Sequence, residues 1–195
     1  MTSPTHYLVI DLEATCSDDD SVPRDEMEII EIGAVLVDAA TLRPAKELQR
    51  FVRPIRHARL TPFCMRLTSI TQAQIDAAPR LPAAIAAMRE LVRGVDALFC
   101  SWGNYDRNQL QRDARRHGVS LPFGADHVNL KAAFARRLGE GRELGVGQAL
   151  RRLGLGFQGT QHRAIDDARN IARLLPYALG VATPPAERGA ARRAP

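Results

Sequence analysis

The sequence predicts an α/β fold in which helices flank a central sheet. Three observations lead to this prediction. Apolar, β-branched runs with the period of strands fill the first third of the chain, and segments with helical spacing follow them. Acidic residues also stand directly after buried apolar runs, which is where open α/β sheets place their functional sites. At 195 residues the chain is expected to form one domain with a sizeable core.

The expected strands come first. Residues 7–10 form an apolar, β-branched run, residues 28–42 form a longer one, and residues 47–55 alternate in polarity. Short turns such as residues 38–41 would join these three strands as a meander. Two short strands are expected later in the chain, at 97–102 and 127–130.

Helical spacing of apolar residues marks most of the remaining chain. Helices are expected at 81–92, 105–117, 131–138, 145–153 and 164–179. Residues 56–78 are expected to be irregular, with a helical tendency only at 71–78. Residues 183–195 contain three prolines and three arginines, so a disordered tail is expected there, and residues 1–182 are expected to form the domain.

Composition excludes several classes of protein. Hydrophobic residues make up 45% and charged residues 25% of the chain, as in ordinary globular proteins. No apolar run approaches the ~20 residues of a membrane span, so no membrane partner is expected. The first residues lack the basic and apolar regions of a secretory signal. Three cysteines, an odd number without metal-type spacing, favour reduced thiols and a cytoplasmic location.

The charge distribution favours a polyanionic partner. The net charge is +5, and arginines concentrate at 50–66, 107–116 and 136–152. Taken singly, each of these groups is explained equally well by a solvated helix face. Taken together, and beside clustered acids, they indicate a groove that holds phosphates near metal ions.

Asp11 and Glu13 are the most informative pair of residues. They stand two apart at the end of the first apolar run, so both side chains would emerge on the same side of the strand. Two carboxylates a few Å apart repel each other and lose hydration unless a cation lies between them. Hard oxygen ligands suit Mg²⁺ or Mn²⁺. For an isolated pair a solvated strand end is the simpler explanation, but further acids and one histidine argue for a metal site.

Two later segments supply these residues. Asp106 follows the fourth expected strand at the start of a helix, where it could equally be a charge stabilised by the helix dipole. His162 precedes the helix at 164–179, whose first turns hold Asp166 and Asp167. A histidine in this place is commonly a cap or a solvated side chain. Beside three separated acids it becomes the obvious general base, whereas chemistry alone does not choose between Asp166 and Asp167.

The order of these residues, Asp-x-Glu, then Asp, then His-x4-Asp, resembles the DEDD exonuclease superfamily in its histidine-containing subclass. Within that subclass the chain is most similar to the 3′-5′ exoribonuclease branch that trims histone mRNA and small RNAs. The similar segments are residues 11–16 (DLEATC), 28–32 (EIIEI), 60–64 (LTPFC), 67–72 (LTSITQ), 154–157 (GLGF) and 162–172 (HRAIDDARNIA). The resemblance spans residues 7–179 and implies a ribonuclease H-like fold with a mixed central sheet. The chain departs from this branch at Tyr105, before the second acid, where relatives often carry tryptophan.

The resemblance implies a role for each matching residue. Asp11, Glu13, Asp106 and Asp167 would be ligands of two divalent cations, Mg²⁺ or Mn²⁺, and His162 would be the general base. The His-x4-Asp spacing selects the second of the two adjacent aspartates. The cations, ~3.5–4 Å apart, would grip the scissile phosphate. A histidine can accept the proton of the attacking water near neutral pH.

The resemblance also implies a way of holding the 3′ end. In the branch that this chain resembles, aromatic side chains matching Phe63 and Tyr105 flank the terminal base. Stacking on such rings requires no particular base. The hypothesis is therefore a clamp of Tyr105 and Phe63, the latter expected in a loop, with the backbone amides of Ala14 and Thr15 near the terminal sugar hydroxyls. The alternative is that both rings are packing residues.

The function implied is that of a metal-dependent 3′-5′ exoribonuclease that hydrolyses single-stranded 3′ ends and releases nucleoside 5′-monophosphates. The expected partner is nucleic acid, with single-stranded RNA 3′ ends first and DNA as the alternative. The second hypothesis is an exodeoxyribonuclease of the proofreading or repair type, because the catalytic acids do not read the 2′-hydroxyl. The third is a catalytically silent module that binds RNA or nucleotides, and the presence of all five catalytic positions argues against it.

Overall fold

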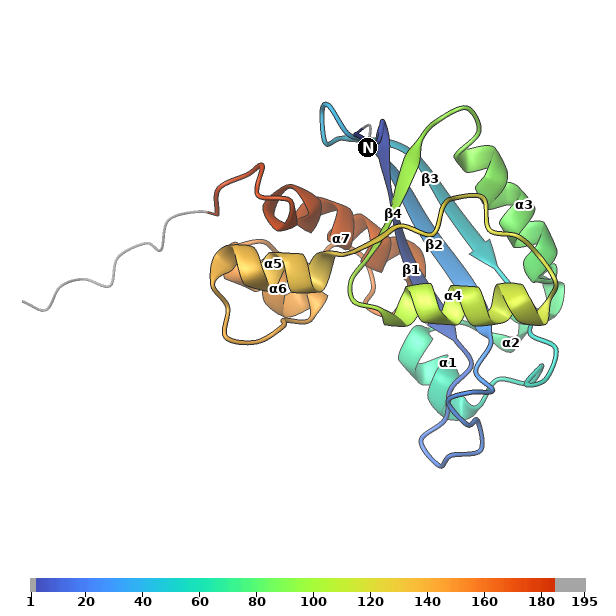
Figure 1. Cartoon of the computed structure of the whole chain (residues 1–195). Coiled ribbons are helices and arrows are strands. Elements are labelled where there is room, and N and C mark those ends of the chain that lie inside the picture. Colours follow the sequence, from blue (N-terminus) through green and yellow to red (C-terminus); the bar gives the residue numbers. More distant parts are fainter. Residues whose placement is uncertain (1–2, 185–195) are drawn as a thin grey trace, which may run out of the picture.

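The computed structural model describes residues 3–184 and arranges them around a five-stranded sheet (Figure 1). Its strands are β1 His6–Ala14, β2 Ile29–Asp38, β3 Pro44–Phe51, β4 Ala97–Ser101 and β5 His127–Asn129. The strand order is β3-β2-β1-β4-β5. The first three strands form the expected antiparallel meander, whereas β4 runs parallel to β1, and β5 parallel to β4. The sheet is therefore mixed, as the ribonuclease H-like fold requires.

Helices pack against both faces of this sheet (Figure 1). They are α1 Pro62–Thr68, α2 Gln72–Ala77, α3 Leu81–Leu91, α4 Tyr105–Arg116, α5 Leu130–Leu138, α6 Val146–Arg152 and α7 Ala164–Ala178. Because side chains alternate along a strand, Leu8 and Ile10 of β1 pack in a core with α3, whereas Val9 packs with α5 and α7. Asp11 and Glu13 continue the series of Val9, so they lie on the sheet face that α7 covers.

Strand β1 extends beyond its parallel neighbour. The pairing of β1 with β4 ends at Val9 and Cys100, but β1 continues to Ala14. On its other edge the antiparallel pairing with β2 persists to the end of β1. The last residues of β1 are thus held firmly from one side, and side chains from other elements can approach them from the side of β4.

One helix lies where the chain was expected to be irregular. The α1 helix begins after Thr61, whose hydroxyl accepts a hydrogen bond from the Cys64 N–H (3.0 Å), and Pro62 occupies its first turn. It ends at Ser69, which has a left-handed φ of 59°. The expectation that Phe63 lies in a loop is therefore wrong. A helix of seven residues is too short to show a hydrophobic period, although its start signals are present in the sequence.

Strand β3 begins and ends earlier than expected, at Pro44–Phe51 instead of 47–55. Beyond Phe51 the Val52 N–H still donates to the Ile30 carbonyl of β2 at 2.9 Å, but the Arg53 N–H donates to the Pro79 carbonyl at 2.8 Å, and Pro54 has no N–H. Glu28 accepts hydrogen bonds from the backbone N–H groups of three successive residues beyond the strand, Ile55, Arg56 and His57, at 3.0, 2.7 and 3.0 Å. These amides point at a side chain and so cannot pair with a neighbouring strand.

Two expectations concern features outside the sheet and its helices. Most of the tail expected at 183–195 falls on residues 185–195, which lie outside the described residues, so that expectation stays a prediction. Among the helices that the structure describes, none has the length and apolar character needed to cross a membrane.

Candidate active site

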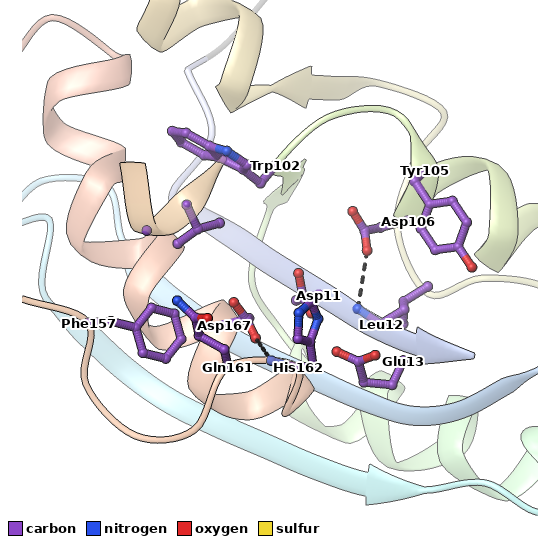
Figure 2. A pocket seen from close by; sticks show the side chains of 12 residues that line it. Asp11, Leu12, Glu13, Trp102, Tyr105, Asp106, Phe157, Gln161, His162 and Asp167 are labelled. Atoms are coloured by element: carbon purple, nitrogen blue, oxygen red, sulfur yellow. Dashed lines mark hydrogen bonds between the residues drawn. The ribbon is translucent and has the colours of Figure 1, made fainter. Parts of the chain in front are cut away.

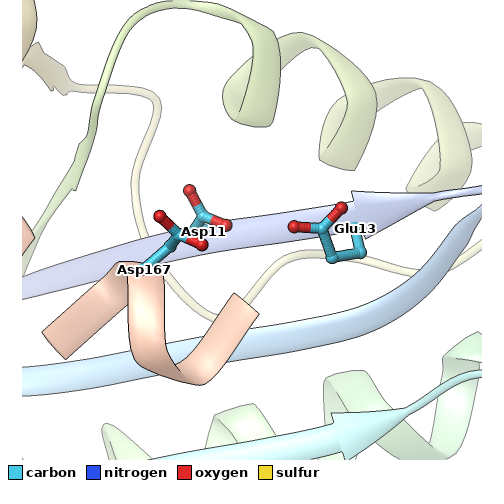
Figure 3. Close-up of side chains that lie close together, drawn as sticks. All are labelled: Asp11, Glu13 and Asp167. Atoms are coloured by element: carbon cyan, nitrogen blue, oxygen red, sulfur yellow. The ribbon is translucent and has the colours of Figure 1, made fainter. Parts of the chain in front are cut away.

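Three carboxylates from two elements converge on the α7 face of the sheet (Figure 3). Asp11 and Glu13 come from the end of β1, and Asp167 comes from the first turn of α7. One oxygen from each lies within 4.8 Å of the others. The period of the strand sets the spacing of the first two acids, and the packing of α7 against the sheet brings in the third. This is the geometry of a cation site made of hard oxygen ligands.

The pKa values of the three carboxylates are all raised, which indicates that no positive charge compensates the cluster. Burial, followed by repulsion from Asp106 and Asp167, raises the pKa of Asp11 well above its usual range. Burial and the neighbouring acids raise the pKa of Glu13 to about 8. Burial raises the pKa of Asp167 to about 6, although the hydrogen bond that it accepts from the His162 N–H acts in the opposite direction. Within residues 3–184, no side-chain cation and no N–H group contacts the carboxylate of Asp11 or of Glu13. The ionised cluster is costly until a cation compensates it.

Asp106 approaches this cluster from the edge of β1 that faces β4. It lies in the first turn of α4, directly after β4, and its Oδ1 accepts a hydrogen bond from the Leu12 N–H at 3.1 Å. This amide belongs to the edge of β1 that β4 leaves unpaired. Burial raises the pKa of Asp106 to about 7, although the backbone hydrogen bonds that it accepts act in the opposite direction. The second acid therefore lies beside the pair on β1, as its place after a buried strand indicated.

His162 stands at the entrance to α7 in a left-handed conformation, with φ at 61°. Its backbone N–H donates to Oδ2 of Asp167 at 2.8 Å, so the histidine and the third acid are held in one local unit (Figure 2). Asp166 has a different role. Its Oδ2 accepts a hydrogen bond from the Thr160 N–H at 2.9 Å, and its Oδ1 forms an ion pair with Arg169. The structure thus places Asp167 in the acidic cluster and uses Asp166 to secure the loop before it.

A cavity of about 430 Å³ unites these residues (Figure 2). Its lining consists of the four acids, the histidine and a partly apolar wall: Asp11, Leu12, Glu13, Trp102, Tyr105, Asp106, Val146, Gly147, Phe157, Gln161, His162 and Asp167. Trp102 lies just beyond β4 and is anchored by its indole N–H, which donates to the Leu144 carbonyl at 2.8 Å. The sequence reasoning did not single out Val146 and Gly147, which begin α6, or Gln161. The only local signal for Gln161 is its place next to His162.

The residues of the proposed clamp lie in different surroundings. Tyr105 lines the cavity, and the residue is 47% exposed. Phe63 is half-buried in the first turn of α1 and does not contribute to the cavity lining. The Thr15 N–H donates to the Glu28 carbonyl at 2.8 Å, so a sugar hydroxyl would have to displace this hydrogen bond to meet the amide. Ala14 follows Leu12 by two residues, so its N–H points to the same edge of β1 as the Leu12 amide.

The donor set fits divalent cations. Carboxylate oxygens are the ligands that Mg²⁺ and Mn²⁺ prefer, and four of them face one cavity with little compensating charge. The soft ligands nearby are unsuitable, because the Cys64 thiol is buried and its Sγ lies against the Ala14 carbonyl (3.6 Å). The arrangement can therefore hold divalent metal beside a histidine, a combination that can activate water and stabilise developing negative charge in hydrolysis of a phosphodiester.

Comparisons with known proteins agree with this geometry. Residues 8–175 match the family RNase_T, described as exonuclease. Mouse ERI1 exoribonuclease 3 is 31% identical over 181 residues, which cover 87% of this chain and 52% of the mouse protein. The Drosophila melanogaster 3′-5′ exonuclease Snipper is 28% identical over 192 residues, covering 88% of this chain and 68% of the fly protein. This chain therefore spans about half the length of its mouse relative.

A solved structure extends the similarity to three dimensions. The nuclease domain of 3′hExo, a DEDDh family member bound to rAMP, superposes with a TM-score of 0.81 at 26% identity. The superposition covers 90% of this chain and 92% of that domain. A second structure, in which a 3′-exonuclease recognises a histone mRNA stem-loop, gives a TM-score of 0.83 at 26% identity and covers 91% of this chain and 65% of the other.

Proposed function

Since this chain belongs to the RNase_T exonuclease family, we propose that it is a divalent-metal-dependent 3′-5′ exoribonuclease. It would hydrolyse single-stranded 3′ ends and release nucleoside 5′-monophosphates. The observation that carries the proposal is the convergence of Asp11, Glu13 and Asp167, without compensating charge, beside Asp106 and His162 in one cavity. The preference for RNA rests on the relatives named exoribonucleases, of which this chain spans about half the length. Residues 1–182 would make up the catalytic domain.

In this proposal Asp11, Glu13, Asp106 and Asp167 hold two divalent cations, Mg²⁺ or Mn²⁺. When bound, such cations neutralise the scissile phosphate and the negative charge that develops on it. His162 is the general base, because it is exposed at the mouth of the cavity and its backbone is tied to Asp167. Its imidazole takes a proton from the water that attacks phosphorus. The bond from phosphorus to the 3′-oxygen of the preceding nucleotide breaks, and the terminal nucleotide leaves as a 5′-monophosphate.

The 3′ end would be held by stacking and by one backbone amide. Tyr105 offers an exposed ring on the wall of the cavity, and a base can stack on such a ring whatever its identity. We keep Phe63 as the second ring of the clamp, which requires it to turn toward the bound base. Ala14 supplies the amide for a terminal sugar hydroxyl. The three free cysteines further lead us to place the protein in a reducing compartment, the cytoplasm.

The test compares matched RNA and DNA oligonucleotides, single-stranded or with a 3′ overhang, in Mg²⁺, in Mn²⁺ and with a chelator. We expect stepwise release of nucleoside 5′-monophosphates from RNA 3′ ends and no release with chelator. Faster digestion of DNA would favour the exodeoxyribonuclease alternative, for which the indifference of the carboxylates to the 2′-hydroxyl leaves room. Activity that resists chelation, or products that carry a 3′-phosphate, would overturn the proposal.

A further inference from the structure

A fully buried carboxylate that the proposed mechanism does not use lies next to the site. Glu31, on β2 opposite Glu13, has no exposed surface. We infer that Glu31 is a positioning residue for His162, acting through the first residues of α7. This inference rests on the proposed role of His162 as the base, but it concerns a part of the chain to which nothing above gives a role.

Most of the hydrogen bonds that Glu31 accepts come from the segment that follows His162. Its Oε2 accepts hydrogen bonds from the Ala164 N–H and from Nε of Arg163, both at 3.1 Å. Its Oε1 accepts from Nη2 of Arg163 at 3.3 Å and from the amide of Gln49 on β3. Both oxygens are occupied, and Arg163 balances the charge. Glu31 therefore belongs with the supports of the site and not with its metal ligands.

The helix that carries the site needs this support. The first N–H groups of a helix have no partner inside it, and a side chain at the N-cap commonly supplies one. The N-cap of α7 is Arg163, which makes no such bond. The Glu31 carboxylate takes its place from another element, and a negative charge at this end also suits the helix dipole. His162 directly precedes this cap and has a left-handed conformation. The position of the capped segment therefore determines the position of the His162 backbone, and with it the point from which the imidazole extends.

A second residue on the same face of β2 brings the helix close. Gly33 stands two residues from Glu31, and a Cβ built on it would lie 2.1 Å from the carbonyl carbon and oxygen of Ala164. The start of α7 thus lies directly on the backbone of β2. Gly33 allows the start of α7 to approach β2 closely, and Glu31 fixes the start of α7 through hydrogen bonds. Together they position the segment that carries His162 and Asp167 relative to the sheet.

The chain offers a matched control for Glu31. Glu28 stands three residues earlier, is also buried (1% exposed), and accepts three backbone N–H groups. Its partners are residues 55–57, which do not line the cavity. Replacing either glutamate by glutamine should destabilise the fold, because a buried hydrogen-bonded charge is lost. Only the change at Glu31 should disturb the chemistry.

The experiment compares Glu31→Gln with Glu28→Gln at saturating Mg²⁺ and single-stranded RNA. For Glu31→Gln we expect kcat to fall by about 10²-fold with a much smaller change in KM, as for misplacement of a catalytic group by about 1 Å. For Glu28→Gln we expect a lower Tm with kcat largely retained. Arg163→Gln tests the pair from its other side: it leaves the Ala164 N–H bonded to Glu31 but removes the charged partner, so the buried carboxylate loses its compensating charge and we expect a lower Tm together with partial loss of kcat.

Hydrogen exchange separates this inference from the proposed function. The amides of residues 162–167 should exchange faster in Glu31→Gln than in Glu28→Gln, whether or not the protein cleaves RNA. Equal exchange in the two variants would overturn the inference. It would be overturned as well if kcat fell equally in both, in proportion to their loss of stability. An inactive wild-type protein with faster exchange in Glu31→Gln would instead refute the proposed function and support the positioning role.

Discussion

Two neighbouring strands of this protein carry pairs of acids in opposite surroundings: the pair at β2 is buried, whereas the pair on β1 is only partly buried. At the start of β2, Glu28 and Glu31 each accept several hydrogen bonds, from backbone amides in one case and from Arg163 and Ala164 in the other. At the end of β1, Asp11 and Glu13 accept none from the described residues, and other acids surround them. The two pairs are similar in composition and differ in their partners.

The difference separates structural acids from functional ones. A buried carboxylate with matched donors ties elements together, and its removal costs stability. A carboxylate crowded by others, without donors, destabilises the fold and persists where a ligand compensates it. The position of an acid in the sequence does not tell the two kinds apart, since all four acids lie in or beside apolar runs: Glu28, Glu31, Asp11 and Glu13. The distribution of donors around them does.

The largest expected effect comes from changing Asp11, one of the two acids on β1 that accept no hydrogen bond from the described residues. Asp11→Asn removes a central ligand, so release of nucleoside 5′-monophosphates from RNA should fall below detection. In chelator the same variant should melt at a higher temperature than the wild type, because it removes a charge from a repulsive cluster. Cleavage assays and thermal melts check the two outcomes. An active Asp11→Asn enzyme would show that the unpaired acids are not ligands.

His162→Ala should lower kcat by roughly 10²–10⁴-fold, the usual contribution of a positioned general base. Binding of a nucleoside 5′-monophosphate, measured by calorimetry with metal present, should change far less. The adjacent acids provide the control for this segment. Asp167→Asn should impair cleavage strongly, whereas Asp166→Asn should mainly loosen the loop that it holds through Thr160. Equal damage from both aspartate variants would contradict the separation of functional from structural acids.

The clamp should contribute less than the acids. Tyr105→Ala should weaken binding of a nucleoside 5′-monophosphate by about 1–3 kcal/mol, the usual magnitude of stacking on one base. Phe63→Ala should do the same if that ring turns toward the bound base, and should leave affinity unchanged if the ring only packs within the fold. Titration of both variants, with melts to confirm folding, decides between the two readings.

The smallest expected effect is on the stability of the metal-free protein. Asp167, Asp106 and Glu13 have folded-state pKa values of about 6, 7 and 8, above those of an unfolded chain. The folded state therefore binds more protons between pH 4 and 8, so the free energy of unfolding falls as pH rises through this window. Melts in chelator should show a Tm that decreases over this range, and Mg²⁺ should reduce the slope. A Tm that rises from pH 6 to 8 in chelator would contradict the assignment of these pKa shifts.

The elements around the site were largely predictable from local patterns. The apolar run of β1 placed Asp11 and Glu13 on one face, and the positions of β4 and α4 placed Asp106 after a buried strand. Helix α7 was expected at nearly its observed bounds. Two features were not predicted: α1, which is too short to show a period, and the early end of β3, where the Arg53 N–H donates to the distant Pro79 carbonyl and Pro54 has no N–H.

Local patterns in the chain specify the strand, the helix and the spacing of the acids, because the periods of strand and helix act over a few residues. They do not specify which acids find donors. Arg163 and Ala164, which bind Glu31, lie 132 and 133 residues away at the start of α7, and the amide that Asp106 holds lies 94 residues before it on β1. Only folding brings such groups within hydrogen-bond distance. The tertiary structure therefore decided that Glu31 supports the site and that Asp11 and Glu13 remain open to a ligand.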